Sequence, residues 1–285
     1  MRSALLAVVL SLFIGPSLAR AVEAEFLSSS TADLDNPHDV KLSPNGKWLF
    51  VSDVGNDRVV ILDAESLKLI GHFGADHQDG THDVDFDEQG RLLVADTHNH
   101  RITIYELDGA TGTLVGELSE RIRKPEGVLA GPGGRIYATG AGSNNLLIYL
   151  GGELVKETVG LSSPHDVEFA PDGDLWVADA ANDRLVRMSP ELEIKTVLQG
   201  TPYDFSGPRY LDVAPDGTLV VADKYTHSIK IIAEGGTLLG VIGDGSRGEG
   251  PGTFTTPEGV ELGDGVAWIA DSGNDRIVKY RLSWD

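Results

Sequence analysis

The sequence predicts an all-β fold, a six-bladed β-propeller, and three observations support this prediction. A unit of about 44 residues occurs six times, helical periodicity is missing between the units, and glycine and proline interrupt the chain at short intervals. The 285 residues include 35 glycines and 13 prolines, so turns are frequent. A fixed period in the forties that is built from short apolar segments is typical of propeller blades.

The repeat can be followed from one end of the chain to the other. The second residues of successive units lie 44, 44, 39, 44 and 49 positions apart. The units begin at Pro37, Thr81, Pro125, Pro164, Pro208 and Pro257. Between them they cover nearly all of the sequence after residue 36, which leaves no room for a second large domain.

Within each unit the local signals predict three antiparallel strands. In the fourth unit, apolar Val167 and Phe169 precede a Pro-Asp-Gly turn at residues 171–173, a second apolar segment ends at Asp179, and a third covers residues 185–188. Short apolar runs separated by such turns form a meander. The fourth strand is expected in the less regular stretch before the next unit, for example residues 193–198 or 237–242.

Ring closure needs a segment from outside the repeats. The last unit ends near residue 282 with almost no chain left for a fourth strand, and residues 23–29 are otherwise unassigned. We therefore expect residues 23–29 to pair with the last blade and close the ring, which also hides sheet edges. Residues 22–285 are predicted to form one propeller domain, and a closed ring of this kind favours a monomer.

The first 21 residues resemble a secretory leader. Arg2 precedes an apolar run over residues 4–14, and Ala19-Arg20-Ala21 is a small-x-small cleavage site. The alternative is an N-terminal membrane anchor, but the run is too short for a typical span. Cleavage predicts a secreted or periplasmic protein without a membrane span.

Composition excludes several classes of protein. The chain has no cysteine, which rules out disulfides, thiol nucleophiles and cysteine-ligated metals. Without residues 1–21 the chain has 21 basic and 44 acidic side chains, a formal charge of −23. Such a charge excludes nucleic acid as a partner.

The strand directions predict a ring of polar side chains at one mouth of the channel. The first and second strands of each unit are antiparallel, so the first strand starts at the mouth of the channel where the second strand ends. The second residue of each unit should therefore face the axis at this mouth. These six residues are His38, His82, Glu126, His165, Arg209 and Glu258. The neighbouring corners add His98, Lys224 and Tyr225. We predict that a small molecule, peptide or protein binds at this mouth through Glu126, Arg209, Glu258, His98 and Lys224.

Three histidines at equivalent positions indicate a metal site. Neutral imidazoles from His38, His82 and His165 would bind zinc or a similar divalent ion. Each of these histidines is followed by an aspartate, and these are Asp39, Asp83 and Asp166. The aspartates could orient the imidazoles or bind calcium with backbone carbonyls. Two alternatives stay open. In the first, the ring residues line a water-filled channel and Arg209 pairs with Glu258. In the second, the aspartates cap backbone amides at the start of the strands.

A second repeated set is assigned to structure. The second strand ends in an aspartate in five units, and an arginine follows the corner in four. The residues are Asp53, Asp96, Asp179, Asp223 and Asp271, with Arg58, Arg101, Arg184 and Arg276. Positions that recur in nearly every blade usually build the repeat.

The repeat motif resembles a known family. The pattern Pro-x-Gly/Asp-Val, Asp-Gly, Val-Ala-Asp and Asn-x-Arg over residues 37–282 is similar to the NHL repeat. This resemblance implies a six-bladed propeller, but it does not imply one function, because NHL propellers include binding platforms and enzymes.

One enzyme branch is similar in more detail, the peptidyl-α-hydroxyglycine α-amidating lyases. The Pro-His-Asp-Val segments at His38 and His165, the Thr-His-Asp-Val segment at His82 and Asp223-Lys224-Tyr225 resemble that family's zinc, calcium and tyrosine segments. The resemblance implies Tyr225 as the catalytic residue. Two departures weaken it: the family spaces its histidines on alternate blades, and the arginine expected directly after one Val-Ala-Asp is absent.

These observations favour a propeller that binds a ligand or partner at the histidine-rich mouth with a divalent metal. The alternative is a metal-dependent lyase that resembles the amidating enzymes. A third hypothesis, a lactonase-type hydrolase, lacks a recognisable set of Glu, Asn and Asp ligands.

Overall fold

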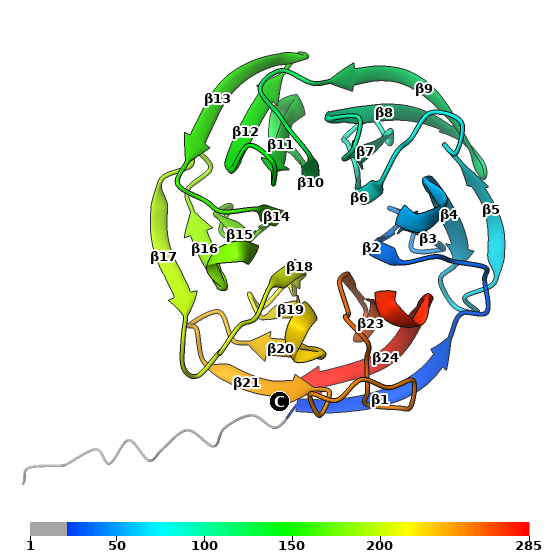
Figure 1. Ribbon diagram of the computed structural model, residues 1–285, viewed down its shortest axis with the longest axis vertical. Helices are drawn as coiled ribbons and strands as arrows, with labels where there is room; N and C mark the ends of the chain where they lie inside the picture. Colours follow the sequence, from blue (N-terminus) through cyan, green and yellow to red (C-terminus); the bar gives the residue numbers. More distant parts are fainter. Residues whose placement is uncertain (1–21, 285) are drawn as a thin grey trace, which may run out of the picture.

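The computed structural model of the chain describes residues 22–284, so the predicted leader lies outside the described residues. Six four-stranded antiparallel sheets surround a central axis, which confirms the six-bladed propeller (Figure 1). The first strand of each blade lies innermost. No helix in the described part of the chain is long and apolar enough to cross a membrane.

The first three blades follow the first three repeat units. Blade 1 contains β2 (Pro37–Leu42), β3 (Trp48–Asp53), β4 (Arg58–Asp63) and β5 (Leu69–Phe73). Blade 2 contains β6 (Thr81–Phe86), β7 (Leu92–Asp96), β8 (Arg101–Asp108) and β9 (Thr111–Leu118). Blade 3 contains β10 (Pro125–Gly131), β11 (Arg135–Gly140), β12 (Asn145–Leu150) and β13 (Glu153–Val159).

The remaining blades repeat this order. Blade 4 contains β14 (Pro164–Phe169), β15 (Leu175–Asp179), β16 (Arg184–Met188) and β17 (Ile194–Gln199). Blade 5 contains β18 (Pro208–Val213), β19 (Leu219–Asp223), β20 (Ser228–Ile232) and β21 (Leu238–Ile242). Blade 6 contains β22 (Val260–Gly263), β23 (Val266–Asp271), β24 (Arg276–Trp284) and β1 (Val22–Ser29). The fourth strands predicted in blades 4 and 5 are thereby confirmed.

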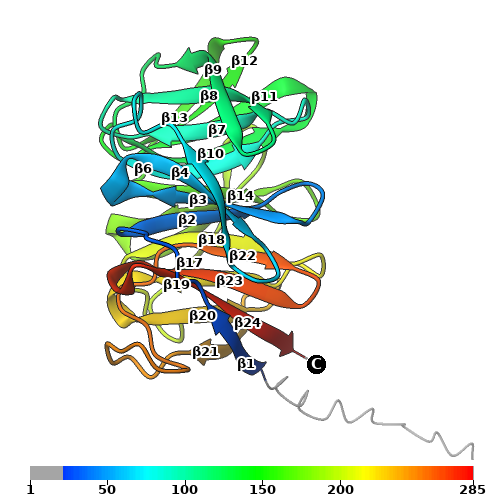
Figure 2. The same cartoon turned by 90° about the vertical axis from the view of Figure 1, so that its right-hand side faces the viewer.

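Closure by the N-terminal segment is also confirmed. Strand β1 pairs antiparallel with β24, from Val22 opposite Trp284 to Ser29 opposite Val278. It lies at the outer edge of the last blade, where the first and last parts of the chain meet (Figure 2). The last blade therefore has four strands although its repeat unit supplies only three.

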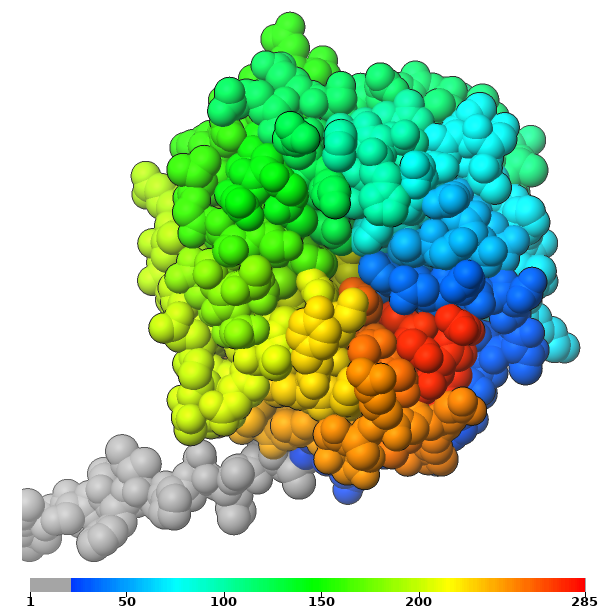
Figure 3. Space-filling view, viewed as in Figure 1, coloured from blue at the N-terminus to red at the C-terminus, as the bar shows by residue number. Residues whose placement is uncertain are grey.

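Five short 3-10 turns connect strands in the described residues. Four of them follow the closing aspartate of a second strand and form corners around one mouth of the channel: η1 (Val54–Asn56), η3 (Ala180–Asn182), η4 (Lys224–Thr226) and η5 (Ser272–Asn274). The fifth, η2 (Pro132–Gly134), joins β10 to β11. A space-filling view shows the six blades meeting around the axis (Figure 3).

Apolar cores lie between neighbouring blades. Strands β7 and β15 are buried along their whole length, because one face of each blade packs on the preceding blade and the other face packs on the following blade. This packing explains why the second strands are apolar almost throughout instead of alternating. The rigid blades then hold the polar ends of the inner strands in fixed positions.

Candidate functional site

The strand registers bring the start of each inner strand to the closing end of the second strand. Pro37 lies opposite Asp53, Pro164 opposite Asp179 and Pro208 opposite Asp223. The residue after each of these prolines therefore lies at the same mouth, as predicted from the strand directions. We call the six residues His38, His82, Glu126, His165, Arg209 and Glu258 the mouth ring.

The mouth ring is largely buried. His38, His82, Glu126 and His165 are less than a tenth exposed, and Glu258 is fully buried. Arg209 is half-buried. Charged and polar groups in such a place are costly unless they find partners, so their contacts decide what the site can do.

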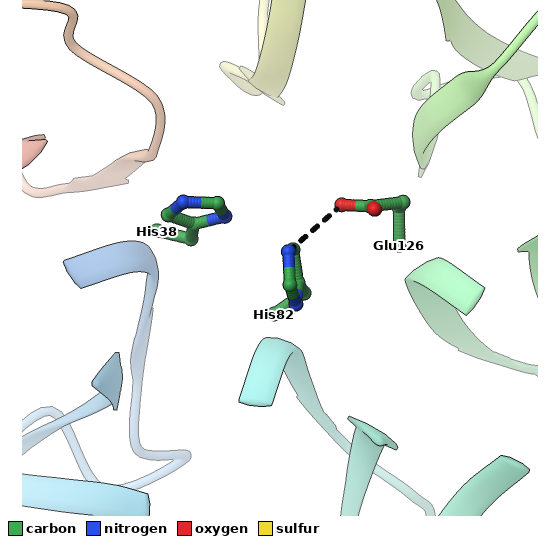
Figure 4. Close-up of side chains that lie close together, drawn as sticks. All are labelled: His38, His82 and Glu126. Carbon is green, nitrogen blue, oxygen red and sulfur yellow. Dashed lines mark ion pairs between the residues drawn. The ribbon is translucent and has the colours of Figure 1, made fainter. Parts of the chain in front are cut away.

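Three ring residues from consecutive blades converge on one point. His38, His82 and Glu126 each present a donor atom, and these atoms lie within 4.8 Å of one another (Figure 4). The Nε2 atom of His82 lies 3.4 Å from Oε2 of Glu126, and the rings of His38 and His82 pack edge to face at 4.5 Å. Two imidazoles and a carboxylate at this separation match the donor set of a divalent metal.

Backbone carbonyls orient two of the histidines. Nδ1 of His82 lies 2.8 Å from the carbonyl oxygen of Gly80, and Nδ1 of His165 lies 2.8 Å from that of Ser163. Since a carbonyl only accepts, each Nδ1 carries the proton and each Nε2 presents its lone pair to the channel.

His165 lies beside the three-residue cluster rather than within it. Its Nε2 accepts a hydrogen bond from the guanidinium of Arg209 and lies 3.7 Å from Oε2 of Glu126. The sequence prediction grouped His38, His82 and His165, whereas the geometry groups His38 and His82 with Glu126. The difference arises because Arg209, from the next blade, occupies the lone pair of His165.

Burial sets the protonation of the cluster. It lowers the pKa of His82 to about 4 and lowers the pKa of His38 and of His165 well below the usual value. All three imidazoles are therefore neutral near neutral pH. Burial, with a contribution from the Glu258 charge, raises the pKa of Glu126 to about 8, so this carboxyl holds a proton at neutral pH.

The mouth ring also collects polar atoms that lack partners. Within residues 22–284, seven buried side-chain nitrogen and oxygen atoms have no hydrogen-bond partner, and four of them belong to the ring. These four atoms are Nδ1 of His38, Oε2 of Glu126, Nε of Arg209 and Oε2 of Glu258. Buried polar atoms are normally satisfied, so these four atoms are available to a partner that enters the channel.

The opposite side of the mouth is basic. Lys224 pairs with Glu258, whose second oxygen lies 3.7 Å from Nε of Arg209. The expected contact of Arg209 with Glu258 is therefore present, although Lys224 is the closer partner. Tyr225 is 58% exposed, and its hydroxyl lies 3.2 Å from a guanidinium nitrogen of Arg209. A ligand entering the mouth would meet this tyrosine and these two cations.

Asp39, Asp83 and Asp166 lie one step deeper in the channel and link neighbouring blades. Asp83 accepts hydrogen bonds from its neighbour Val84 and from the amide of Val128 in the next blade, both at 2.6 Å. Asp166 accepts from Val167 and Leu211 in the same way. Burial raises the pKa of all three aspartates. Their hydrogen bonds match the capping alternative.

The corner histidine His98 is exposed. Its Nδ1 lies 2.8 Å from Asp79, and its ring lies 6.1 Å from that of His82. His98 is thus at the rim of the mouth, outside the buried cluster.

The closing aspartates are structural. Oδ2 of Asp96 accepts from Arg101 at 2.7 Å while Oδ1 accepts the amide of Asp79 at 2.8 Å, and the same pattern occurs at Asp53, Asp179 and Asp271. In blade 5, Lys230 replaces the arginine at Asp223. These bonds agree with the structural assignment made from repetition.

Sequence reasoning did not identify a further repeated set, which we call the corner set. Each member has a positive φ between 49° and 59°, and its side chain accepts a backbone amide of the next blade. The members are Asp57, His100, Asn144, Asp183, His227 and Asp275. Asp, Asn and His are the residues other than glycine that tolerate this conformation best, so their recurrence at one position was the available signal.

Comparison with known proteins supports the architecture. A family model described as "Lactonase, 7-bladed beta-propeller" matches residues 39–132, about a third of the chain, whereas the structure has six blades. A search of curated proteins gives no match. The NHL resemblance therefore stays a prediction.

Solved structures give the same result at the level of fold. Virginiamycin B lyase from Staphylococcus aureus is 17% identical with a TM-score of 0.66, and the match covers 92% of this chain and 100% of that one. A streptogramin B lyase is 16% identical with a TM-score of 0.67, covering 94% and 100%. An auxiliary nutrient binding protein from Bacteroides ovatus is 13% identical with a TM-score of 0.72, covering 93% and 77%. Such low identities show a shared propeller fold alone.

Proposed function

We propose that the mouth ring binds a divalent metal ion, with zinc favoured, and that the protein uses this site to bind a small molecule or peptide. The observation that carries the proposal is the convergence of His38, His82 and Glu126 within 4.8 Å. The partnerless atoms of His38 and Glu126 support it, because a metal would satisfy both.

The donor set suits zinc better than calcium. Two neutral imidazoles and one carboxylate are typical of sites that leave a position open for a ligand, whereas calcium takes six to eight oxygens. When bound, such an ion acts as a Lewis acid toward an oxygen of the ligand. His82 is held in the required tautomer by Gly80, so it needs no rearrangement to bind.

The basic side of the mouth suggests an anionic group on the ligand. Arg209 and Lys224 share the single carboxylate of Glu258, which leaves one positive charge in excess. Arg209 also has a partnerless Nε. A carboxylate on the ligand would therefore find a charged hydrogen-bond donor across the mouth from the metal cluster.

The test is metal analysis combined with titration. Purified protein, stripped with a chelator and titrated with zinc, should bind one equivalent, and calcium should not compete. A protein that binds no zinc, or that binds it equally well after His82→Ala, would refute the proposal.

The second candidate function is a metal-dependent lyase. The observation that favours it is Tyr225, which is exposed at the mouth with its hydroxyl 3.2 Å from Arg209. As a base, the tyrosine would accept the proton of a substrate hydroxyl as the carbon–oxygen double bond forms and the adjacent carbon–nitrogen bond breaks, and it would return that proton to the departing amide nitrogen. Support also comes from the resemblance of the histidine segments to the amidating lyases and from the two lyases among the structural relatives.

A direct assay separates the two functions. Zinc-loaded protein would be incubated with a peptide that ends in α-hydroxyglycine, and glyoxylate would be measured. Turnover that is lost in Tyr225→Phe would favour the lyase, whereas zinc binding without turnover would favour the binding protein.

We also propose that residues 1–21 are cleaved and that the mature protein is secreted or periplasmic. Mass spectrometry of the protein from the producing cells, after fractionation, would test this. A mature chain that retains residue 1 would contradict it.

A further inference from the structure

A cavity of about 480 Å³ opens at the mouth opposite the ring, between blades 5 and 6. It is lined by the ends of β18 and β22, by the turns that follow them, and by Leu282 and Trp284 of β24. Because β18 starts at the mouth ring, its end lies at the other face of the propeller. The volume is within the range of small-molecule sites, roughly 300–1,000 Å³.

Side chains of different size occupy the end of the inner strand in different blades. Phe86 in blade 2 and Phe169 in blade 4 pack edge to face on an aromatic ring of the preceding blade. Blades 5 and 6 have the smaller Val213 and Leu262 at the equivalent positions, and both line the cavity.

The inner end of the cavity is acidic. Asp212 and Glu261 line it, together with Lys41. The ammonium of Lys41 lies 3.8 Å from Glu261, but it also faces Glu168 at 3.3 Å and Asp85 at 3.6 Å. The carboxyl groups thus outnumber the ammonium group that they share, and burial raises the pKa of Glu261 well above its usual value, so Asp212 is the main carrier of negative charge on the cavity lining.

Asp212 carries charge at neutral pH. Burial raises its pKa to about 6, and Lys41 opposes that rise. Its two oxygens accept the amides of Val213 at 2.6 Å and Leu262 at 2.7 Å, and a carboxylate oxygen can accept a further bond. A second cation would therefore be attracted to this end of the cavity.

The outer part of the cavity is apolar and held in place. The indole nitrogen of Trp284 donates to Asp216 at 3.0 Å, which ties the end of β24 to the turn of blade 5. Pro215, Val266 and Leu282 complete the apolar wall. An apolar wall above an acidic floor is complementary to a molecule with one cationic end.

We propose that this cavity binds an organic amine whose ammonium group lies at Asp212 and Glu261 and whose apolar part packs against Trp284 and Leu262. The acidic floor excludes carboxylates, and the tryptophan favours an aromatic or aliphatic body. The site is independent of the proposed metal, since it lies at the opposite mouth and uses none of the ring residues.

The experiment uses the full mature chain and phenethylamine as the probe, with binding followed by calorimetry. Two probes of similar shape, 3-phenylpropionate and 2-phenylethanol, are the matched controls. Phenethylamine should bind at least about 10-fold more tightly than either control, because it alone carries a positive charge. Equal binding of the amine and the alcohol, or preferential binding of the carboxylate, would overturn the proposal.

Two variants locate the binding. Asp212→Asn removes the charge and should weaken phenethylamine binding about 10-fold. Trp284→Ala removes the apolar wall at the end of the last strand and should also weaken it, whereas Trp48→Ala, a tryptophan that does not line the cavity, should not. If Asp212→Asn fails to fold, the two tryptophan variants still decide. Equal affinity in Trp284→Ala and wild type would refute the proposed site.

Discussion

Two sets of six side chains surround the same mouth, and they differ in how completely they are partnered. Every member of the corner set accepts a backbone amide of the next blade. The mouth ring instead has four partnerless buried atoms, and its members contact one another. Repetition with full hydrogen bonding marks the structural set, whereas variation with missing partners marks the set that is available to a ligand.

Histidine illustrates the difference most clearly. His100 and His227 each accept an amide, at 3.1 and 3.0 Å, and so replace the Asp or Asn found in other blades. His38 and His82 instead pack edge to face on each other at 4.5 Å. A histidine count alone would therefore place six residues near one site when only some can bind a ligand.

The largest expected effect concerns the closing aspartates, which are partnered as fully as the corner set. Asp96→Ala removes the partner of Arg101 and of the Asp79 amide, and it should lower the free energy of unfolding by about 3 kcal/mol. Chemical denaturation measures this change. Zinc affinity should stay within twofold of wild type.

Glu117→Ala is the matched control for Asp96→Ala. Glu117 also pairs with Arg101 at 2.7 Å, but it is exposed, so its loss should change the free energy of unfolding by less than about 0.5 kcal/mol. Equal destabilisation by the two variants would show that burial at the corner does not matter.

The next effect separates the two kinds of histidine. His82→Ala should weaken zinc binding about 100-fold, because it removes a ligand, and it should change stability little. His100→Ala should do the reverse, with unchanged zinc affinity and a loss of about 1 kcal/mol from the free energy of unfolding. Zinc titration and denaturation of both variants, with exposed His72→Ala as the control, measure this. Similar zinc affinities in all three variants would mean that the ring is not the binding site.

We expect the proposed zinc binding to depend on pH through Glu126. Its pKa of about 8 means that zinc must displace a proton below that pH, so apparent affinity should rise by up to about 10-fold per pH unit until the pH reaches about 8. His82, with a pKa of about 4, is already neutral and adds no slope near neutral pH. Zinc titrations between pH 6 and 8 should show this rise, and Glu126→Gln should abolish it. A pH-independent affinity in wild type would contradict the assignment.

The same carboxyl affects the stability of the metal-free protein. Its folded pKa lies above the ordinary value of 4.5, so the folded state holds a proton that the unfolded state releases. The resulting stabilisation is complete below pH 4.5 and is lost as the pH rises to about 8. Between pH 4.5 and about 8, the free energy of unfolding should therefore fall less in Glu126→Gln than in wild type, as measured by denaturation. Parallel pH profiles would rule out a raised pKa.

The smallest expected effect tests whether Arg209 keeps His165 out of the cluster. Arg209→Gln frees Nε2 of His165 and removes a nearby positive charge, so zinc affinity should rise about 5-fold, or roughly 1 kcal/mol. When cobalt is bound in place of zinc, its visible absorption should be more intense in this variant than in wild type, as expected for a site with four ligands. The double variant Arg209→Gln/His165→Ala should lose this gain. A gain that persists in the double variant would exclude His165 as the added ligand.

The sequence predicts the blades, their strands, the closing strand and the ring of second residues. These features depend on local alternation, turn chemistry and a constant repeat, all of which are carried by neighbouring residues along the chain. Residues 23–29 were assigned to the last blade because no other segment remained, and β1 confirms that assignment.

Which ring residues meet depends on how the blades pack together. Glu126 joins His38 and His82, whereas Nε2 of His165 accepts a hydrogen bond from Arg209 of the next blade, 44 residues away. The roles of Asp83 and Asp166 likewise depend on amides 45 residues away in the next blade. Strand periodicity determines which way a side chain points, but the partner it finds depends on how whole blades pack, and that is not encoded in any local pattern.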